Sequence, residues 1–573
     1  MKQASRYGVE LGFPTAPSLG SIPVDLTIGQ RPWYRSAAKM QTFVRYRVAF
    51  TLVALLIVFG ELQLLLPLST AVKIGADEDY ELSKATLCNH GYNLYTQIWN
   101  DQPPLVTFII ANLIKQLPHS ILAPRLLTVG FTMVLLTAAF TLIRAVSGPL
   151  AASVATVMFI GSPGFLELSA SVMQEIPALA PVIAAMCVLL LGRHSKWQVT
   201  EIVAGLVFGF ALQMKLIGAA YFPIAGLILW FRSKPLLCWA TTQLSRGTDD
   251  GRAWRLSKGI FAFGMSMFVT FIALNYLTGN SLLLQLEQSW AAHFATTKSF
   301  EYGSPQEHGY DWSVPLKNWE TTAPALLGIW VLASRLRRRW EVLPLIWLIL
   351  TFVVFGTHKP WWAYYYIHNA LPLCWCAGVG IAFLWEKLRS KYAQSLSSDS
   401  APPNEGKRSR YRLRSQRPFH AGRIRWQAAA LLLLGLCAAG WMGARLYLEE
   451  QAIRRAPRLY TCLVLKEIER FKPFTTFMFS DQPIYSFHAD LPMPPHLGVL
   501  SLKRFWTGEL DNAAIRAELE ALKPGLILLG KESREVPYEE LLNREYRLVY
   551  RDSANRLYAH ETISKKPSLL TTE

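Results

Sequence analysis

Residues 48–87 read VAFTLVALLIVFGELQLLLPLSTAVKIGADEDYELSKATL, an apolar run followed closely by an acidic cluster. The run from Val48 to Ser69 is long enough to cross a bilayer, which needs roughly 20 apolar residues. No small-residue cleavage site follows it, so the sequence favours a retained membrane anchor over a signal peptide. Four acids then fall within five positions: Asp77, Glu78, Asp79 and Glu81. The stretch predicts a membrane helix with charged side chains just beyond one end.

Ten further apolar blocks follow this first run. They cover residues 125–145, 150–166, 176–192, 199–214, 216–231, 259–277, 322–334, 341–356, 364–385 and 426–447. Together the blocks predict an all-α polytopic membrane domain over residues 48–447, with about eleven transmembrane helices. The composition agrees, because 51% of residues are hydrophobic and only 17% are charged, whereas soluble proteins carry about 25% charged residues.

The positive charges indicate how these helices are oriented. With the N-terminus inside, the predicted inner segments hold 31 Lys and Arg and the predicted outer segments of the membrane domain hold 8. Cytoplasmic loops of membrane proteins carry such an excess. We therefore expect a disordered basic cytoplasmic tail at 1–47, a first outer loop at 70–124 and a basic cytoplasmic loop at 386–425. Topology accounts for the net charge of +18, and no nucleic-acid partner is predicted.

Residues 448–573 have the composition of an ordinary soluble domain, and the charge pattern places them on the outer face. Strand-like runs occur at FTTFMF (474–479), GLILLG (525–530) and YRLVYRD (546–552), and helix-like stretches at 453–470 and 511–523. The segment predicts a small extracytoplasmic α/β domain. It contains no nucleotide-binding loop and no nucleophile motif.

The first outer loop contains the strongest candidates for chemistry. Acids at a helix start are favoured by the helix dipole, and that explanation suffices for Asp79 and Glu81, which we expect at the surface. Asp77 and Asp101 instead sit at junctions: one follows a membrane helix, and the other precedes Pro103-Pro104 and a new apolar run. Ionisable groups held at a bilayer surface are candidate functional groups.

A single outer carboxylate suits one reaction class in particular. A sugar carried on a lipid phosphate has an acidic leaving group that needs no general acid, while a hydroxyl acceptor needs a general base. Cations or a metal ion can stabilise the departing phosphate. A glycosidase differs, because it requires two carboxylates flanking the bond.

The motifs of this loop carry a family resemblance. DEDY (77–80), GYNLY (91–95) and WNDQPPL (99–105), in this order directly after the first membrane helix, resemble the first outer loop of the GT-C superfamily. The similarity is to the branch that contains the protein O-mannosyltransferases and the lipid A aminoarabinose transferase. It continues, with decreasing strength, through PRL (124–126), EIP (175–177), GFALQMKLIGAAYFP (209–223), WAAHF (290–294) and HKPWWAYYYIHNALPLCWCAG (358–378).

The resemblance implies a set of site residues. It makes Asp77 the general base, Glu78 a supporting acid and Asp101 a second acid near the donor or a metal. The candidates for contacting the donor and its lipid phosphate are Arg125, Glu175, Lys215 and Lys359. Asp101 and His293 are the candidate ligands of a divalent metal ion. Family members often carry a lysine directly after the second acid, where this chain has Gln102, so a cation must reach that position from elsewhere.

The sequence and the resemblance together predict an integral membrane glycosyltransferase. It would transfer a sugar, with inversion, from a polyprenyl-phosphate carrier to a hydroxyl on a lipid, glycan or protein acceptor. The expected location is a bacterial inner membrane, surrounded by membrane lipids, with the C-terminal domain in the periplasm. A transporter or flippase of a lipid-linked sugar is the alternative, although such proteins usually carry ionisable groups deep within helices. A non-catalytic scaffold would leave Asp77 and Asp101 unexplained.

Overall fold

The computed structural model describes residues 32–117, 120–192, 198–233, 250–294, 297–299, 301–335, 339–399, 417–531 and 538–566. The chain divides into two units, residues 1–50 and 51–573. Helix α1 (Pro32–Leu64) begins within the predicted tail, of which residues 1–31 lie outside the described residues. At the predicted basic loop, 400–416 likewise lie outside the description, and helices extend into both of its ends.

Each of the eleven predicted apolar blocks coincides with a helix. They are α1, α4 (Leu122–Ser147), α5 (Pro149–Ile160), α7 (Glu175–Leu191), α8 (Val199–Met214), α9 (Phe222–Ser233), α10 (Asp250–Leu277), α13 (Trp319–Ser334), α14 (Leu343–Thr357), α15 (Tyr366–Asp399) and α17 (Arg417–Arg454). Among the described residues, six helices are long and apolar enough to span a membrane, within α1, α4, α10, α14, α15 and α17. The polytopic helical fold is confirmed, while the number of spans stays a prediction.

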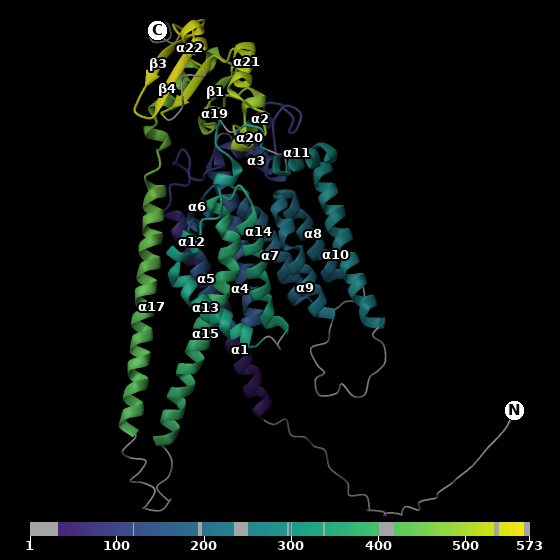
Figure 1. Ribbon diagram of the computed structural model, residues 1–573, viewed down its shortest axis with the longest axis vertical. Coiled ribbons are helices and arrows are strands. Elements are labelled where there is room, and N and C mark those ends of the chain that lie inside the picture. Colours follow the sequence, from purple (N-terminus) through teal and green to yellow (C-terminus); the bar gives the residue numbers. More distant parts are fainter. Residues whose placement is uncertain are drawn as a thin grey trace, which may run out of the picture. The chain divides into compact units, whose positions relative to one another are not determined.

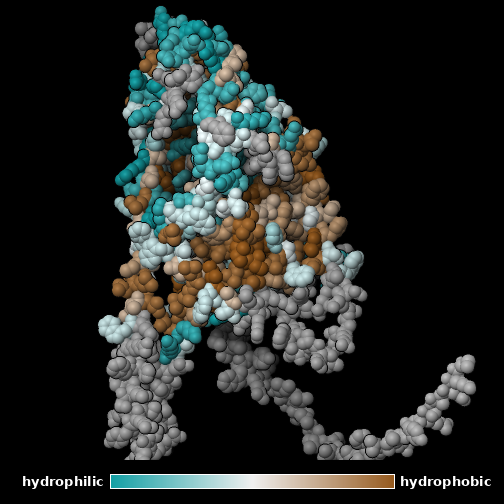
Figure 2. All heavy atoms as spheres, viewed as in Figure 1, coloured by the Kyte–Doolittle hydropathy of each residue, from teal (hydrophilic) through white to brown (hydrophobic). Residues whose placement is uncertain are grey.

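The surface of this helical region is apolar. Large hydrophobic side chains such as Phe268 on α10, Trp330 on α13 and Leu432 on α17 are more than half exposed. Figure 2 shows hydrophobic residues gathered over the helices and hydrophilic residues over the C-terminal domain. Such a surface suits lipid, because exposed apolar area on this scale is unfavourable in water.

Glycines let two helix pairs approach closely. A Cβ atom at Gly209 of α8 would overlap the carbonyl of Met267 on α10. A Cβ atom at Gly328 of α13 would overlap the carbonyl of Cys376 on α15. Small residues favour helix association in membranes, because backbones pack without intervening side chains.

The C-terminal domain is an α/β unit, as predicted. Strands β1 (Met478–Ser480), β2 (Leu526–Gly530), β3 (Tyr546–Arg551) and β4 (Asn555–His560) form one sheet in the order β1-β2-β4-β3. β1 pairs with β2 in parallel and the other pairs are antiparallel. The domain's helices are α18 (Leu463–Phe471), α19 (Ile484–Ala489), α20 (Leu502–Trp506), α21 (Asn512–Leu522) and α22 (Glu539–Glu545).

Strand β2 divides its side chains between two hydrophobic cores. Ile527 and Leu529 pack in a core that belongs to the C-terminal domain alone. Leu526 and Leu528 point to the opposite face, as successive residues of a strand do. They join a core that also contains residues of two helices in the first outer loop, α2 (Glu78–Asn89) and α3 (Leu105–Gln116).

The shared core joins the C-terminal domain to the segment 70–124 between the first membrane helices. Figure 1 shows β1, α19 and α20 gathered beside α2 and α3. A backbone bridge pairs Ala71, before α2, with Arg458, after α17. The first outer loop and the last domain therefore form one packed body, and the candidate site lies within it.

Candidate active site

The side chains of Asp77 and Glu78, at the start of helix α2, point in different directions. Asp77 occupies the N-cap position, yet its side chain makes no capping bond. Its Oδ2 accepts a hydrogen bond of 2.8 Å from the hydroxyl of Tyr364. Glu78 is rotated by about 100° around the helix axis and points into the protein interior, where it is fully buried. The acidic cluster is thus split between a cavity and the core.

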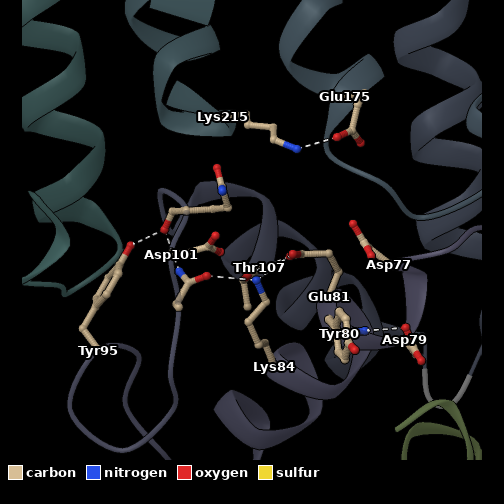
Figure 3. A network of polar contacts seen from close by, with 12 residues as sticks. Asp77, Asp79, Tyr80, Glu81, Lys84, Tyr95, Asp101, Thr107, Glu175 and Lys215 are labelled. Carbon is tan, nitrogen blue, oxygen red and sulfur yellow. Dashed lines mark hydrogen bonds and ion pairs between the residues drawn. The ribbon is translucent and has the colours of Figure 1, made fainter. Parts of the chain in front are cut away.

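Asp77 lines a cavity of about 270 Å³ that is built by six parts of the chain, Lys215 after α8 being one of them. The others are α2, the segment around 99–102, the start of α7, the segment 362–365, and residues 499–503 of the C-terminal domain. Its charged lining residues are Asp77, Glu81, Lys84, Asp101, Glu175, Lys215 and Lys503. In Figure 3 the side chains of Asp77, Asp101, Glu175 and Lys215 surround the same space.

Four acidic side chains line this cavity, and three of them form an ion pair with a lysine. Lys503 Nζ lies 2.6 Å from Asp101 Oδ2, and Lys84 Nζ lies 2.6 Å from Glu81 Oε1. Lys215, directly after α8, forms an ion pair with Glu175, the first residue of α7.

Asp77 is the acid that differs. Within the described residues, no ion pair joins its carboxylate to a lysine or arginine, and Tyr364 is its side-chain partner. A carboxylate without a cation partner keeps its oxygens available to accept a proton from a bound hydroxyl group.

Glu78 and Arg125 form a buried pair outside the cavity lining. Arg125 Nε and Nη2 donate to the two carboxylate oxygens of Glu78, each at 2.8 Å. The backbone amides of Ile74 and Val172 also donate to Glu78, and Arg125 Nη1 donates to the carbonyls of Leu68 and Ala71. Their predicted direct roles, as supporting acid and phosphate ligand, do not fit this geometry, because both groups are enclosed and fully occupied by each other and the backbone.

Two acids expected at the surface are buried. Asp79 is 5% exposed and pairs with Lys73 at 2.8 Å. Burial raises its pKa above the ordinary value, although Lys73 opposes that shift. Glu81 is 6% exposed and also accepts a hydrogen bond of 3.1 Å from Thr107 on α3. The surface expectation is wrong for both residues, because packing around α2 removes them from solvent.

Two other predicted residues are not part of the cavity as described. Lys359 is exposed and does not line the cavity, although Trp362, Tyr364 and Tyr365 shortly after it do. The side chain of His293, in α11 (Leu282–Phe294), lies outside the described residues. Of the predicted residues, the structure places Asp77, Asp101, Glu175 and Lys215 around one space, and the role of His293 stays a prediction.

Asp101, one of the two predicted metal ligands, pairs with a lysine. Asp101 holds the ammonium group of Lys503. In the part of the chain that the structure describes, no group of three His, Cys, Asp or Glu side chains could hold a metal ion. The side chain of His293, the other predicted ligand, lies outside the described residues, so a metal ion bound at Asp101 stays a prediction.

Sequence reasoning missed Lys84, Tyr364 and Lys503 as cavity residues. Tyr364 belongs to the motif at 358–378, but three consecutive tyrosines there gave no means of choosing one. Lys84 follows Glu81 by three residues, a spacing that brings two side chains together on a helix. Nothing in the sequence around Lys503 indicates its position in the cavity, because its partner Asp101 lies 402 residues away.

Solved structures share this architecture. ArnT from Cupriavidus metallidurans bound to undecaprenyl phosphate matches with a TM-score of 0.57 and 14% identity, over 89% of this chain and 97% of that chain. ArnT from the same organism in the apo state matches with a TM-score of 0.56 and 16% identity, over 91% and 98%. The archaeal oligosaccharyltransferase AglB from Archaeoglobus fulgidus, in complex with an inhibitory peptide and a dolichol-phosphate, matches with 0.51 and 12%, over 85% and 70%.

These matches define the fold. No protein-family model and no curated protein sequence matches the chain. The chain has a helical membrane fold similar to those of ArnT and AglB, with a small C-terminal α/β domain. Its arrangement is the ArnT-like form of that fold, because the match extends over nearly the whole ArnT chain and includes the C-terminal domain.

Proposed function

We propose that the protein is an integral membrane glycosyltransferase that uses a polyprenyl-phosphate sugar as its donor. The observation that carries the proposal is the cavity in which Asp101 and Glu175 each pair with a lysine, while Asp77 has no such partner among the described residues. ArnT, whose fold is similar, has been solved with undecaprenyl phosphate bound. The acceptor is a hydroxyl group on a lipid, a glycan or a protein.

The proposed reaction requires one proton transfer and one displacement. Asp77 accepts the proton of the acceptor hydroxyl, whose oxygen then forms a bond to the anomeric carbon. The bond between that carbon and the phosphate oxygen breaks, and polyprenyl phosphate leaves with the electron pair. Inversion at the anomeric carbon follows from attack opposite to the leaving group. No general acid is needed, because the phosphate is a good leaving group at neutral pH.

Lysines around the cavity would stabilise the charge that develops on the phosphate. Lys215 is buried beside Glu175, and its ammonium lies 5.5 Å from the ring centre of Tyr365. A fixed cation in a site from which water is largely excluded stabilises a departing anion more than it would in bulk water. Glu175 positions Lys215 rather than acting on the phosphate itself.

The proposed location is a bacterial inner membrane, with the cavity and the C-terminal domain facing the periplasm. The excess of Lys and Arg in the predicted inner segments supports this orientation. A fold similar to that of bacterial ArnT supports the choice of membrane.

The reaction class can be tested with purified protein in sealed vesicles. Undecaprenyl-phosphate sugars with a radiolabelled sugar are added on one side, together with membrane extract as a source of acceptors. We expect the label to move into a new covalent product while unsubstituted undecaprenyl phosphate accumulates. Passage of intact labelled donor across the vesicle membrane without any new product would instead identify a transporter.

Tyr364 is expected to position the general base. Replacing Tyr364 by Phe removes the 2.8 Å hydrogen bond to Asp77. A hydrogen bond to a charged group contributes about 1.5–3 kcal/mol, so kcat should fall about 10- to 100-fold with little change in KM. Steady-state kinetics with the labelled donor measure both constants.

Tyr366 provides the matched control for this substitution. Its hydroxyl accepts a hydrogen bond of 3.0 Å from Asn318, and it does not line the cavity. Tyr366→Phe should therefore alter stability without a comparable loss of kcat. Equal losses of kcat in the two variants would contradict a specific role for Tyr364.

A further inference from the structure

The cavity receives one cation from the C-terminal domain. Lys503 lies in the first turn of α20 and reaches Asp101 in the first outer loop, 402 residues earlier in the chain. Each of these side chains is 13% exposed and each lines the cavity. The neighbouring Gln102 also lines the cavity but carries no charge. Within the first outer loop, Lys84 lines the cavity as well. Lys503 therefore places a second positive charge beside this loop, directly on Asp101, where the neighbouring Gln102 has none.

The backbone around Lys503 is held on both sides. Ser501 caps α20 by accepting a hydrogen bond of 3.4 Å from the Lys503 amide. The carbonyl of Leu500 accepts a bond of 3.0 Å from the hydroxyl of Tyr80 on α2. The following residue, Arg504, is 4% exposed and donates to the carbonyls of His496 and Val499. Lys503 thus projects from a fixed turn rather than from a mobile loop.

Contacts from α20 and the turn after it attach this region to two outer segments of the membrane domain. Glu509 accepts a hydrogen bond of 2.8 Å from the indole of Trp99, two residues before Asp101. The carbonyl of Trp506 accepts from the backbone amides of Lys298 and Ser299 at 2.7 and 3.2 Å. The C-terminal domain is therefore fixed against the cavity on either side of Lys503.

The surroundings keep the ammonium group charged. Burial lowers the pKa of Lys503, but the carboxylate of Asp101 raises it, and the net direction is above the ordinary value. An ammonium group has three N–H donors, so its pairing with Asp101 is compatible with contact to a ligand oxygen. A partly desolvated cation binds an anion more strongly than an exposed one does.

We propose that Lys503 binds the phosphate of the lipid carrier, and hence that the C-terminal domain supplies part of the donor site. The inference rests on the proposed function. In it, Asp101 positions Lys503 in the cavity, while Lys503 contacts the phosphate directly. Lys503 thereby supplies the positive charge that the uncharged side chain of Gln102 cannot.

The experiment compares undecaprenyl phosphate with undecaprenol, which has the same chain without the phosphate. Binding of both to the detergent-solubilised full chain is measured for the wild type, Lys503→Met and Lys503→Arg. In Lys503→Met, affinity for undecaprenyl phosphate should fall about 10- to 100-fold, because one charged hydrogen-bond partner is lost. Affinity for undecaprenol should not change. Lys503→Arg should retain most of the preference for phosphate.

Two further variants separate phosphate binding from effects on folding. Lys466→Met removes one exposed lysine from α18 of the same domain and should leave both affinities unchanged. Gln102→Lys combined with Lys503→Met returns an ammonium group to the cavity from the neighbouring position and should restore part of the phosphate preference. Because the readout is a ratio of two affinities for one variant, a loss of folded protein does not imitate the expected result.

The outcomes distinguish the inference from the proposed function. If the wild type binds undecaprenyl phosphate no better than undecaprenol, the proposed donor class fails, and the inference fails with it. If the wild type shows the preference and Lys503→Met keeps it in full, the inference alone is overturned.

Discussion

Replacing Asp77 by Asn is expected to lower the rate of sugar transfer by about 10²- to 10⁴-fold, the usual contribution of a general base. Asparagine keeps the shape of the side chain and can still accept the hydrogen bond from Tyr364. It cannot take a proton from the acceptor, so kcat should fall while donor binding is retained. Single-turnover kinetics with a labelled undecaprenyl-phosphate sugar measure the transfer step directly.

Asp79→Asn is the matched control for this prediction. It removes the same charge from the same helix, but Asp79 pairs with Lys73 and does not line the cavity. We expect altered stability and a transfer rate within a few-fold of the wild type. Wild-type transfer by Asp77→Asn would show that another group is the base, and with it the central claim of the proposed mechanism would fail.

Replacing Arg125 by Met is expected to destabilise the protein by about 3–5 kcal/mol, because it leaves the carboxylate of Glu78 buried without its cation. Both side chains are fully buried, and their two hydrogen bonds are 2.8 Å long. The pair connects α2 to α4 and fixes the start of α2, where Asp77 sits. Thermal unfolding of the detergent-solubilised protein measures the loss.

Two further variants serve as controls for Arg125→Met. Arg144→Met removes an exposed arginine from the last turn of the same helix and should have little effect on stability. Glu78→Met combined with Arg125→Met removes both charges and should recover part of the lost stability. If Arg125→Met unfolds like the wild type and loses only its affinity for undecaprenyl phosphate, then Arg125 is a phosphate ligand after all, as the family resemblance implied.

The membrane helices were predictable from the sequence because each depends on the composition of its own segment. All eleven apolar blocks coincide with helices. Helix ends were less predictable: α1 begins well before Val48, because a helix can continue into polar sequence once an apolar segment has nucleated it. The predicted strand-like runs overlap β1, β2 and β3, and none covers β4, Asn555–His560. Asp552 stabilises the turn before this strand by accepting hydrogen bonds from the amides of Ala554 and Asn555.

The candidate site was predictable only where its residues lie next to one another in recognisable motifs. Asp77, Asp101, Glu175 and Lys215 were found in this way, and the structure brings them to one cavity. The sequence could not show that Glu78 faces Arg125, because 47 residues separate them and the acid looks like its neighbours.

Burial and distant partners account for the remaining differences. The C-terminal domain packs against α2 and α3 and buries part of their surface. The sequence of the segment 70–124 does not predict this burial. For the same reason Asp79 and Glu81 read as surface residues. Lys503 belongs to a domain whose own sequence has no catalytic motif, so its role depends entirely on where the fold places it.

The shared core and the cavity combine parts of the chain that are synthesised far apart in time. The first outer loop emerges early from the ribosome, but the chain segments that cover it and complete its cavity are among the last to be made. Until those segments are made, the residues of α2 and α3 that belong to the shared core lack the C-terminal side chains that bury them. A chain that ended after α17 would lack Lys503 and the C-terminal residues of the shared core, and with them one wall of the cavity.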